Sequence, residues 1–499
     1  MDMSQFGSTR GLLLGLVLAL AVATGAWLAV FGDFNGNSGG LTQKAGRAGC
    51  VSVDGSGGFS DGANAGECAV AGAVGLPTAL VVSPDGRNAY VAGHREAVAV
   101  LDRDPRSGAL AAKPGLSGCA SRDGTAGGER ARRLQGAASP LARARVCAVG
   151  RGLFGVGDIA LSPDGRNAYV SSAEGLAIFD IAARGGLTQK RGAAGCLTGS
   201  GTDRTSGRPS CGRARGLESV SSVTVSPDGR TVYVTSVDVL AFARDARTGA
   251  LTQIPGRAGC VAATRAGQGG RACAADPVVA GATSLTVSGD GRQVYAASGG
   301  DTGGAGAVAI LARDRSTGAL TPAPGRRSCI AQAGDCTRAR GLRGTAAVAM
   351  SPDGANAYAV SFLGCAIAVF DRDAASGALV QKPGDAGVAT RHGDSGACNN
   401  RRTIQGGLAA GGDATVSTDG RTVFVTSRAG VAMYARAPGG ALRYLGCVSD
   451  NGEGTCEDVK ALNAPTAPAV SPDGRDVYVA AFGGDAIGAF DMPRRARGG

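Results

Sequence analysis

The stretch Ser83-Pro84-Asp85-Gly86-Arg87-Asn88-Ala89-Tyr90-Val91 decides the fold of this 499-residue chain. Its first four residues, or a close variant of them, occur seven times along the sequence. Repetition of one short motif at regular intervals is typical of solenoids and propellers. The copies begin at Ser83, Ser162, Ser226, Ser288, Ser351, Ser417 and Ser471.

The repeated tetrapeptide predicts a hairpin turn. An apolar run such as residues 79–82 precedes each copy, and a strand with an aromatic residue such as Tyr90 follows it. Proline presets φ for the first turn position, and glycine supplies the positive φ needed where the next strand begins. A third apolar run follows, and then in most repeats a fourth that opens with Ala-Leu, as at Leu110. Four antiparallel strands per repeat predict an all-β, seven-bladed propeller.

The two ends of the repeat array complement each other. The seventh repeat stops after its third strand, residues 486–491, without a fourth. Residues 39–44, Gly-Gly-Leu-Thr-Gln-Lys, copy residues 185–190, which occupy the fourth-strand position of an internal repeat. We therefore expect the segment near Leu41 to complete the last blade, because closure hides the sheet edges.

The aromatic residue of the second strand recurs in every repeat and is expected to pack in the blade core. An aromatic platform that stacks on sugars is the alternative, but a residue present at every equivalent position is more often packing. The set is Tyr90, Tyr169, Tyr233, Tyr295, Tyr358, Phe424 and Tyr478.

Residues 1–32 contain an unbroken apolar run from Gly11 to Phe31. Such a run is typical of a signal peptide or of a signal-anchor helix, and either assignment predicts export. Residues 33–39 are interpreted as a linker, residues 40–492 as the propeller and residues 493–499 as a basic tail. We expect an extracellular protein, secreted or anchored, that touches the membrane only through residues 11–31 if they are retained.

Fourteen cysteines follow the register of the repeats and suit an oxidising compartment. In most repeats a cysteine follows the fourth-strand leucine and has a partner in the same loop; Val388 replaces it once, which leaves Cys398 for Cys365. Recurrence favours local disulfides, although sequence alone leaves the connectivity open, and a metal site is not expected. The predicted pairs are Cys50–Cys68, Cys119–Cys147, Cys196–Cys211, Cys260–Cys273, Cys329–Cys336, Cys365–Cys398 and Cys447–Cys456.

The net charge of +11 includes arginine clusters at residues 130–151 and 494–497. Such clusters favour anionic surfaces, and solvated loops are the alternative interpretation. Four further positions predict a basic ring near the mouth of a central channel, because each cation stands two residues before a leucine that precedes an innermost strand. These residues are Arg151, Arg215, Arg340 and Lys460. Their alternative role is to satisfy loop carbonyls or to pair with neighbouring acids.

The expected partner of this ring is an anionic small molecule or a cell-envelope polymer. Nucleic acid is not expected, because export and the lack of a recognised binding module oppose it. The sequence predicts no cofactor, and we expect a monomer.

The motif Ser-Pro-Asp-Gly-Arg-Asn-Ala-Tyr-Val, present at residues 83–91 and 162–170, resembles the repeat of lactonase-like propellers with YVTN-type repeats. The Asp-Arg-Asp and Ser/Thr-Gly-Ala-Leu segments that follow extend the resemblance over nearly all of residues 40–491. It implies a seven-bladed, exported propeller. The family includes lactone hydrolases of the 6-phosphogluconolactonase type and surface proteins without an assigned role, but no catalytic motif carries over residue by residue.

A lactonase would need a general base and a group that stabilises the carbonyl oxygen. The chain has two histidines, and their neighbours give two candidate sets: His94 with Arg95 and Glu96, and His392 with Arg391 and Asp394. Loop histidines are more often bystanders than catalysts. The first predicted function is therefore non-catalytic binding or scaffolding through disulfide-closed loops on one face, and the alternative is lactone hydrolysis.

Overall fold

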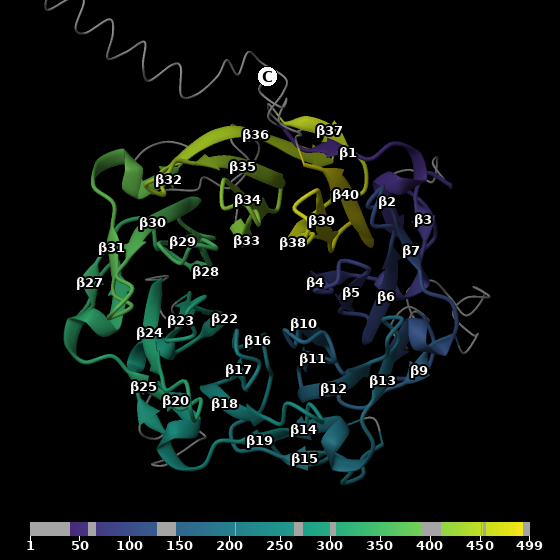
Figure 1. The fold of residues 1–499 in the computed structure, drawn as a ribbon, viewed down its shortest axis with the longest axis horizontal. Helices are drawn as coiled ribbons and strands as arrows, with labels where there is room; N and C mark the ends of the chain where they lie inside the picture. The colour runs from purple at the N-terminus through teal and green to yellow at the C-terminus, as the bar shows by residue number, and fades with distance from the viewer. Residues whose placement is uncertain are drawn as a thin grey trace, which may run out of the picture. The chain divides into compact units, whose positions relative to one another are not determined.

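The computed structural model describes residues 40–57, 66–126, 146–204, 206–263, 273–299, 306–390, 411–450, 452 and 456–492. Residues 41–492 fold into seven sheets that radiate from a common axis (Figure 1). The predicted seven-bladed propeller is confirmed. We number the blades by the repeat that supplies their inner strands, so that Ser83 lies in blade 1 and Ser471 in blade 7.

Each blade starts at the axis with two strands joined by the repeated turn. In blade 1, the amide of Gly86 donates to the carbonyl of Ser83 at 2.8 Å, and Gly86 has a φ of 70°. The innermost strands are β4 (Pro77–Val82), β10 (Val156–Leu161), β16 (Ser222–Val225), β22 (Ala282–Val287), β28 (Thr345–Met350), β33 (Gly411–Val416) and β38 (Pro465–Val470). The second strands are β5 (Asn88–Gly93), β11 (Asn167–Ser172), β17 (Thr231–Thr235), β23 (Gln293–Ser298), β29 (Asn356–Ser361), β34 (Thr422–Ser427) and β39 (Asp476–Ala481).

The third strand of each blade carries the outer part of the sheet, and short 3₁₀ turns precede two of the inner strands. These turns are η2 (Gly72–Val74) and η8 (Pro277–Val279). The third strands are β6 (Ala97–Arg103), β12 (Gly175–Ile181), β18 (Val239–Arg244), β24 (Ala307–Arg313), β30 (Ala366–Arg372), β35 (Gly430–Arg436) and β40 (Ala486–Asp491).

The fourth strand is broken into two pieces in six blades, and both pieces pair with the third strand. A 3₁₀ turn separates them, because a glycine with positive φ, such as Gly256 at 64°, redirects the backbone. The pairs of pieces are β1 (Thr42–Gln43) and β2 (Cys50–Ser52), β7 (Leu110–Ala112) and β8 (Cys119–Ser121), β13 (Leu187–Gln189) and β14 (Cys196–Thr198), β19 (Leu251–Gln253) and β20 (Cys260–Ala262), β25 (Leu320–Pro322) and β26 (Cys329–Ala331), and β31 (Leu379–Gln381) and β32 (Val388–Thr390). The turns are η1 (Gly46–Gly49), η3 (Leu116–Gly118), η5 (Gly192–Gly195), η6 (Gly256–Gly259), η9 (Gly325–Ser328) and η10 (Gly384–Gly387). Blade 6 instead has the continuous β36 (Leu442–Asp450).

A short fifth strand, which the sequence did not predict, runs parallel to the fourth in six blades of the described chain. It covers the outer edge of the sheet, which would otherwise expose unpaired backbone groups. The fifth strands are β3 (Ala69–Val70), β9 (Ala148–Val149), β15 (Gly212–Arg213), β21 (Ala274–Ala275), β27 (Thr337–Arg338) and β37 (Glu457–Val459).

The ring closes as the sequence predicted, with the first strands of the propeller on the third strand of the last repeat. Strand β1 pairs with β40 in the register Thr42 to Asp491, and β2 continues with Cys50 opposite Gly488. Lys44 follows β1 and is 2.5 Å from the carboxylate of the buried Asp476. Blade 7 is therefore built from both ends of the propeller sequence.

The repeated aromatic residues pack between blades and are fully buried, so the core prediction is confirmed. Six of them are tyrosines, and each hydroxyl donates to a glycine carbonyl of the adjacent blade; Tyr169, for example, is 2.9 Å from the oxygen of Gly249. A buried phenol needs such a partner. The tyrosines thus hold neighbouring blades together as well as filling the core.

The disulfides close loops at equivalent places in the blades. Each joins the start of the second piece of the fourth strand, or the matching point of β36, to the residue before the fifth strand. Cys365 is also disulfide-bonded, and its predicted partner Cys398 lies outside the described residues. Six predicted pairs are confirmed, namely Cys50–Cys68, Cys119–Cys147, Cys196–Cys211, Cys260–Cys273, Cys329–Cys336 and Cys447–Cys456.

These disulfides indicate an oxidising environment, of the kind found outside the cytosol. The apolar run of residues 11–31 lies outside the described residues, so its assignment as a signal peptide or anchor stays a prediction. Within the described part of the chain, no helix has both the length and the apolar character that a membrane crossing requires.

Candidate functional site

The first candidate catalytic set lies where blade 1 meets blade 7. His94 follows β5, and its ring centroid is 6.1 Å from that of Phe482. Arg95 forms an ion pair of 2.6 Å with Asp485, and Glu96 forms one of 3.2 Å with Arg122. The charged neighbours of the histidine are thus engaged with other residues. Arg391, His392 and Asp394, the second candidate set, lie outside the described residues.

The four cations of the predicted basic ring lie over the outer strands of the blades and not at the axis. The amide of Arg215 donates to the side chain of Gln253 at 2.9 Å, and that side chain donates back to the carbonyl of Arg215 at the same distance. The guanidinium of Arg215 then reaches the carbonyl of Gly256 in the turn η6 at 3.3 Å. Glutamines of the fourth strand hold the other three in the same way, through Gln189 for Arg151, Gln381 for Arg340 and Gln43 for Lys460.

The predicted position near the channel mouth is therefore wrong. The glutamines hold the backbone of these four residues at the outer strands, and their side chains point outward from there. The guanidinium of Arg340 is 2.7 Å from the carbonyl of Gly384, and that of Arg151 contacts the carbonyls of Ser210, Lys190 and Gly192. Lys460 pairs with Glu67 at 2.8 Å. Binding of an anion by these residues stays a prediction.

Irregular strand starts create a different candidate site near the axis. In most blades the innermost strand has a bulge at the end that lies next to the disulfide-closed loops. Bulges re-aim side chains and are common beside functional sites. In blades 2 and 6 the bulge places carboxylates, Asp158 and Asp413, on the innermost strands. We call these two residues the axial carboxylate pair.

Asp158 is surrounded by donors. One of its carboxylate oxygens accepts from the amide of Ile159 at 2.7 Å, and the other accepts from the hydroxyl of Ser222 and the amide of Val223, both at 3.0 Å. Burial raises the pKa of Asp158, and these three hydrogen bonds oppose the rise. Because Ser222 and Val223 belong to blade 3, the carboxylate also links two innermost strands.

Asp413 has fewer donors and titrates near neutrality. Its carboxylate accepts from the amide of Ala414 at 2.8 Å. Burial, followed by the negative charge of Asp158, raises the pKa of Asp413 to about 7. A carboxylate whose pKa lies near neutrality is suited to general acid–base chemistry. Asp413 is therefore the member of the pair able to exchange a proton near pH 7.

A second feature of the same face is a pair of guanidinium groups stacked on one ring. The Cζ atoms of Arg122 and Arg204 lie 5.3 and 5.4 Å from the centroid of Phe154. Glu174 accepts from the amides of Phe154 and Arg204, at 3.3 and 2.9 Å, and so fixes the two backbones together. We call Arg122, Phe154 and Arg204 the Arg-Phe-Arg stack. Guanidinium groups ordered in this way can present donors to a carboxylate or phosphate.

Neither feature was identified from the sequence, although a signal for one was present. Asp158 and Asp413 each stand four residues before a repeat serine, where the other repeats carry alanine or serine. A carboxylate at an expected inner-strand position would have marked both. The stack joins parts of the chain that are far apart in sequence, and no periodicity reports such a contact. No group of three or more side chains suited to a metal ion occurs among the described residues.

Comparison with known proteins gives likeness only at the level of solved structures. No family model and no curated protein matches the sequence. A periplasmic gluconolactonase from Pseudomonas aeruginosa is 17% identical, with 77% of this chain and 88% of that chain covered and a TM-score of 0.46. Hydrazine synthase from Kuenenia stuttgartiensis is 14% identical, with 83% and 95% covered and a TM-score of 0.46. A provisionally named 6-phosphogluconolactonase from Bacteroides uniformis is 17% identical, with 77% and 86% covered and a TM-score of 0.45. The named activities differ, and these values assign none of them to this chain.

Proposed function

We propose that this chain is an exported binding protein whose disulfide-closed loops present a surface for an anionic ligand on one face of the propeller. The main observation behind this proposal is that equivalent disulfides close loops of different length. The cysteines are separated by 28 residues in blade 1, by 15 in blade 2 and by 7 in blade 4, while their Cα atoms are 4.8 to 5.0 Å apart in all three. A constant base with variable loops is how rigid scaffolds carry binding residues.

The Arg-Phe-Arg stack supports an anionic ligand. Arg122 is the first residue after β8 and lies inside the loop closed by Cys119 and Cys147, and Arg204 lies inside the loop closed by Cys196 and Cys211. Two neighbouring loops thus bring cationic groups to the same ring. The remaining sequence of the blade 1 loop contains five further arginines between residues 127 and 145, which favours a carboxylated or phosphorylated polymer over a neutral one.

A loop graft tests this proposal. Residues 122–146 are replaced with Gln-Ala-Gly-Asp, the sequence of residues 332–335 that spans the matching position in blade 4. Because the disulfide and the strands on either side are kept, we expect the melting temperature to change by only a few degrees. Binding to immobilised polygalacturonate at low salt is expected to fall at least 10-fold, with no binding of either protein to neutral dextran.

The matched control neutralises charge elsewhere. Replacing Arg494, Arg495 and Arg497 with glutamine lowers the net charge without altering a loop, and this variant is expected to bind polygalacturonate like the unchanged protein. Equal binding by the grafted and unchanged proteins would rule out the blade 1 loop as the ligand surface.

The axial carboxylate pair favours a second candidate function, lactone hydrolysis. A general base works best when its pKa lies near the working pH, and Asp413 meets this condition. Ring opening of a lactone needs a base that takes a proton from water as the water attacks the carbonyl carbon. Asp413 would supply this base, its pKa raised by burial and then by the charge of Asp158.

An assay on purified protein separates the two candidates. Hydrolysis of a lactone panel is followed between pH 5 and 9, with Asp413→Asn as the test and His94→Gln as the comparison. A lactonase that uses Asp413 shows a rate that rises through about pH 7 and falls at least 100-fold in Asp413→Asn. Activity that is lost in His94→Gln and kept in Asp413→Asn would move the catalytic site to blade 1, and no hydrolysis of any lactone would leave the binding function alone.

A further inference from the structure

A recurring arginine ties five pairs of adjacent blades together on the face opposite the disulfides. It stands at the end of the third strand and reaches into the preceding blade, where it contacts the aspartate of the repeated turn and the first residue of the second strand. Arg244 is the clearest case, with distances of 2.8 Å to Asp164, 2.7 Å to Asn167 and 2.7 Å to the hydroxyl of Tyr169. We call this arrangement the arginine clasp. The clasp residues are Arg103, Arg244, Arg313, Arg372 and Arg436.

Blades 2 and 7 carry an apolar residue at the clasp position. The amide of each clasp arginine donates to the carbonyl of the residue after the repeated turn, as Arg244 does to Arg230 at 2.8 Å. Ile181 makes the same bond to Arg166, and Met492 makes it to Arg475, both at 2.8 Å. This shared hydrogen bond identifies Ile181 and Met492 as the residues that replace the arginine.

The two exceptions differ in what the preceding blade offers. In blade 6, the blade that Met492 faces, Phe424 replaces the tyrosine of the clasp and Thr422 is the first residue of the second strand. The phenol is therefore lost together with the arginine. In blade 1, the blade that Ile181 faces, all three acceptors are kept, as Asp85, Asn88 and Tyr90. The junction between blades 1 and 2 is therefore a clasp with its cation removed.

The acceptors at this junction lack the partners that their equivalents have. Asn88 is only 5% exposed, and its amide nitrogen donates to Asp102 at 2.9 Å, but among the described residues nothing donates to its oxygen. One oxygen of Asp85 accepts from Ser83 and Arg87, while the other has no partner in the described chain. The pKa of Tyr90 is raised by burial and then by the charges of Asp85 and Asp102, with no guanidinium to oppose the rise as Arg244 does at Tyr169.

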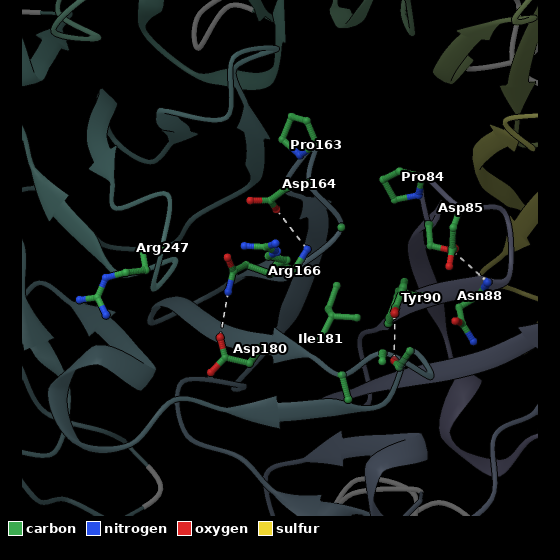
Figure 2. Close-up of a pocket in the computed structure, with 16 residues that line it drawn as sticks. Pro84, Asp85, Asn88, Tyr90, Pro163, Asp164, Arg166, Asp180, Ile181 and Arg247 are labelled. Carbon is green, nitrogen blue, oxygen red and sulfur yellow. Dashed lines mark hydrogen bonds between the residues drawn. The ribbon is translucent and has the colours of Figure 1, made fainter.

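A cavity of about 580 Å³ lies at this junction. Figure 2 shows its two sides. Asp85, Asn88 and Tyr90 of blade 1 lie on one side of Ile181, and Arg166 of blade 2 lies on the other side. Asp164 and Asp180, which also line it, are paired with Arg244 and Lys190, so Asp85 is the carboxylate left for a ligand. The volume is that of a small-molecule pocket.

We propose that this cavity binds an alkylguanidinium cation, whose planar head group takes the place that the clasp arginine occupies at the other junctions. The acceptors already match such a group, because the same three positions hold a guanidinium in the neighbouring blades. A planar fork of donors can serve Asp85, Asn88 and the Tyr90 oxygen together, which a compact ammonium group does less well. The site lies on the face opposite the disulfide-closed loops, so it is independent of the proposed function.

Titration calorimetry with agmatine at low ionic strength tests the site. A ligand of this size with one charged contact at the rim is expected to bind one per chain, with a Kd of about 0.1–1 mM. Asp85→Asn is expected to weaken binding at least 5-fold, and n-butylamine is expected to bind at least 5-fold more weakly than agmatine. N-acetyl-arginine amide distinguishes the source of the cation, since binding of both guanidinium compounds indicates a site open to peptides and binding of agmatine alone indicates a free small molecule.

Ile181→Arg fills the site from within. It is expected to abolish agmatine binding and to raise the melting temperature, because it restores the clasp. Met492→Arg is the matched control: it makes the same kind of change where the phenol is missing, and it is expected to leave agmatine binding intact. Absence of saturable binding by the unchanged protein, or equal affinity in Ile181→Arg, would overturn the proposal.

Discussion

Replacing Arg103 with methionine is expected to lower the free energy of unfolding by about 3–5 kcal/mol. The Arg103 guanidinium is almost fully buried and contacts Asp473, Asp476 and the hydroxyl of Tyr478. At the other clasps the second-strand acceptor is neutral, but here it is the buried Asp476, which without Arg103 would keep only Lys44 as a cationic partner. Urea denaturation followed by far-UV circular dichroism measures the loss of unfolding free energy.

Two comparisons make this prediction specific. Arg106→Met removes an exposed arginine three residues away and should change the stability by less than about 0.5 kcal/mol. Arg244→Met removes a clasp whose buried acceptor is the neutral Asn167, so its cost should be smaller than that of Arg103→Met. If Arg103→Met were no less stable than Arg244→Met, the charged acceptor at the closing blade would have no special role.

Replacing Asp413 with asparagine is expected to stabilise the protein at neutral and alkaline pH and to leave it unchanged near pH 4 and below. The pKa of Asp413 is about 7 in the folded chain, against 3.8 for an unperturbed aspartate. Between these two values the folded state binds a proton that the unfolded state has released, so stability falls as pH rises through this range. About three pKa units correspond to a penalty of up to ~4 kcal/mol above pH 7, and solvent near the carboxylate reduces it.

The measurement is the urea midpoint at a series of pH values from 4 to 8.5. The midpoints of Asp413→Asn and of the unchanged protein should coincide near pH 4, separate progressively between pH 4 and 7, and stay apart by a constant amount above that, with the variant more stable. Asp419→Asn, an exposed aspartate in the turn of the same blade, is the matched control and should show no such separation. A pH-independent difference between Asp413→Asn and the unchanged protein would mean that burial does not raise this pKa.

The blades, the closure and the disulfide pattern could be predicted because each is encoded locally and repeated. A Pro-Asp-Gly turn imposes its own backbone geometry, and a cysteine at a constant distance from Leu110 or Leu251 reports the same loop each time. The break in the fourth strand was not predicted, although a glycine that redirects the backbone, such as Gly256, stands at it. The short parallel fifth strands, such as β9, were not predicted either, because a strand of two residues shows no periodicity in the sequence.

The candidate sites were harder to predict because they depend on where side chains turn. Arg215 has the predicted place in the sequence, but its backbone is held by Gln253 and its head group points to an outer turn. The missing arginine at Ile181 can be recognised only by comparison with the other blades. That comparison requires the contacts of the clasp arginines, which the sequence does not give. The effect of Asp158 on Asp413 requires two innermost strands to be placed around one axis.

Closure of the ring by β1 and β2 on β40 has a consequence for biosynthesis. Chains are made from the amino end, so the first two strands of the propeller must wait through the synthesis of the whole repeat array for their partner. Blades 1 to 6 have their own strands in sequence order and can form as they emerge, whereas blade 7 can be assembled only at the end. Premature termination before residue 486 would therefore release a molecule with an open rim at both ends of the array, a ready template for polymerisation.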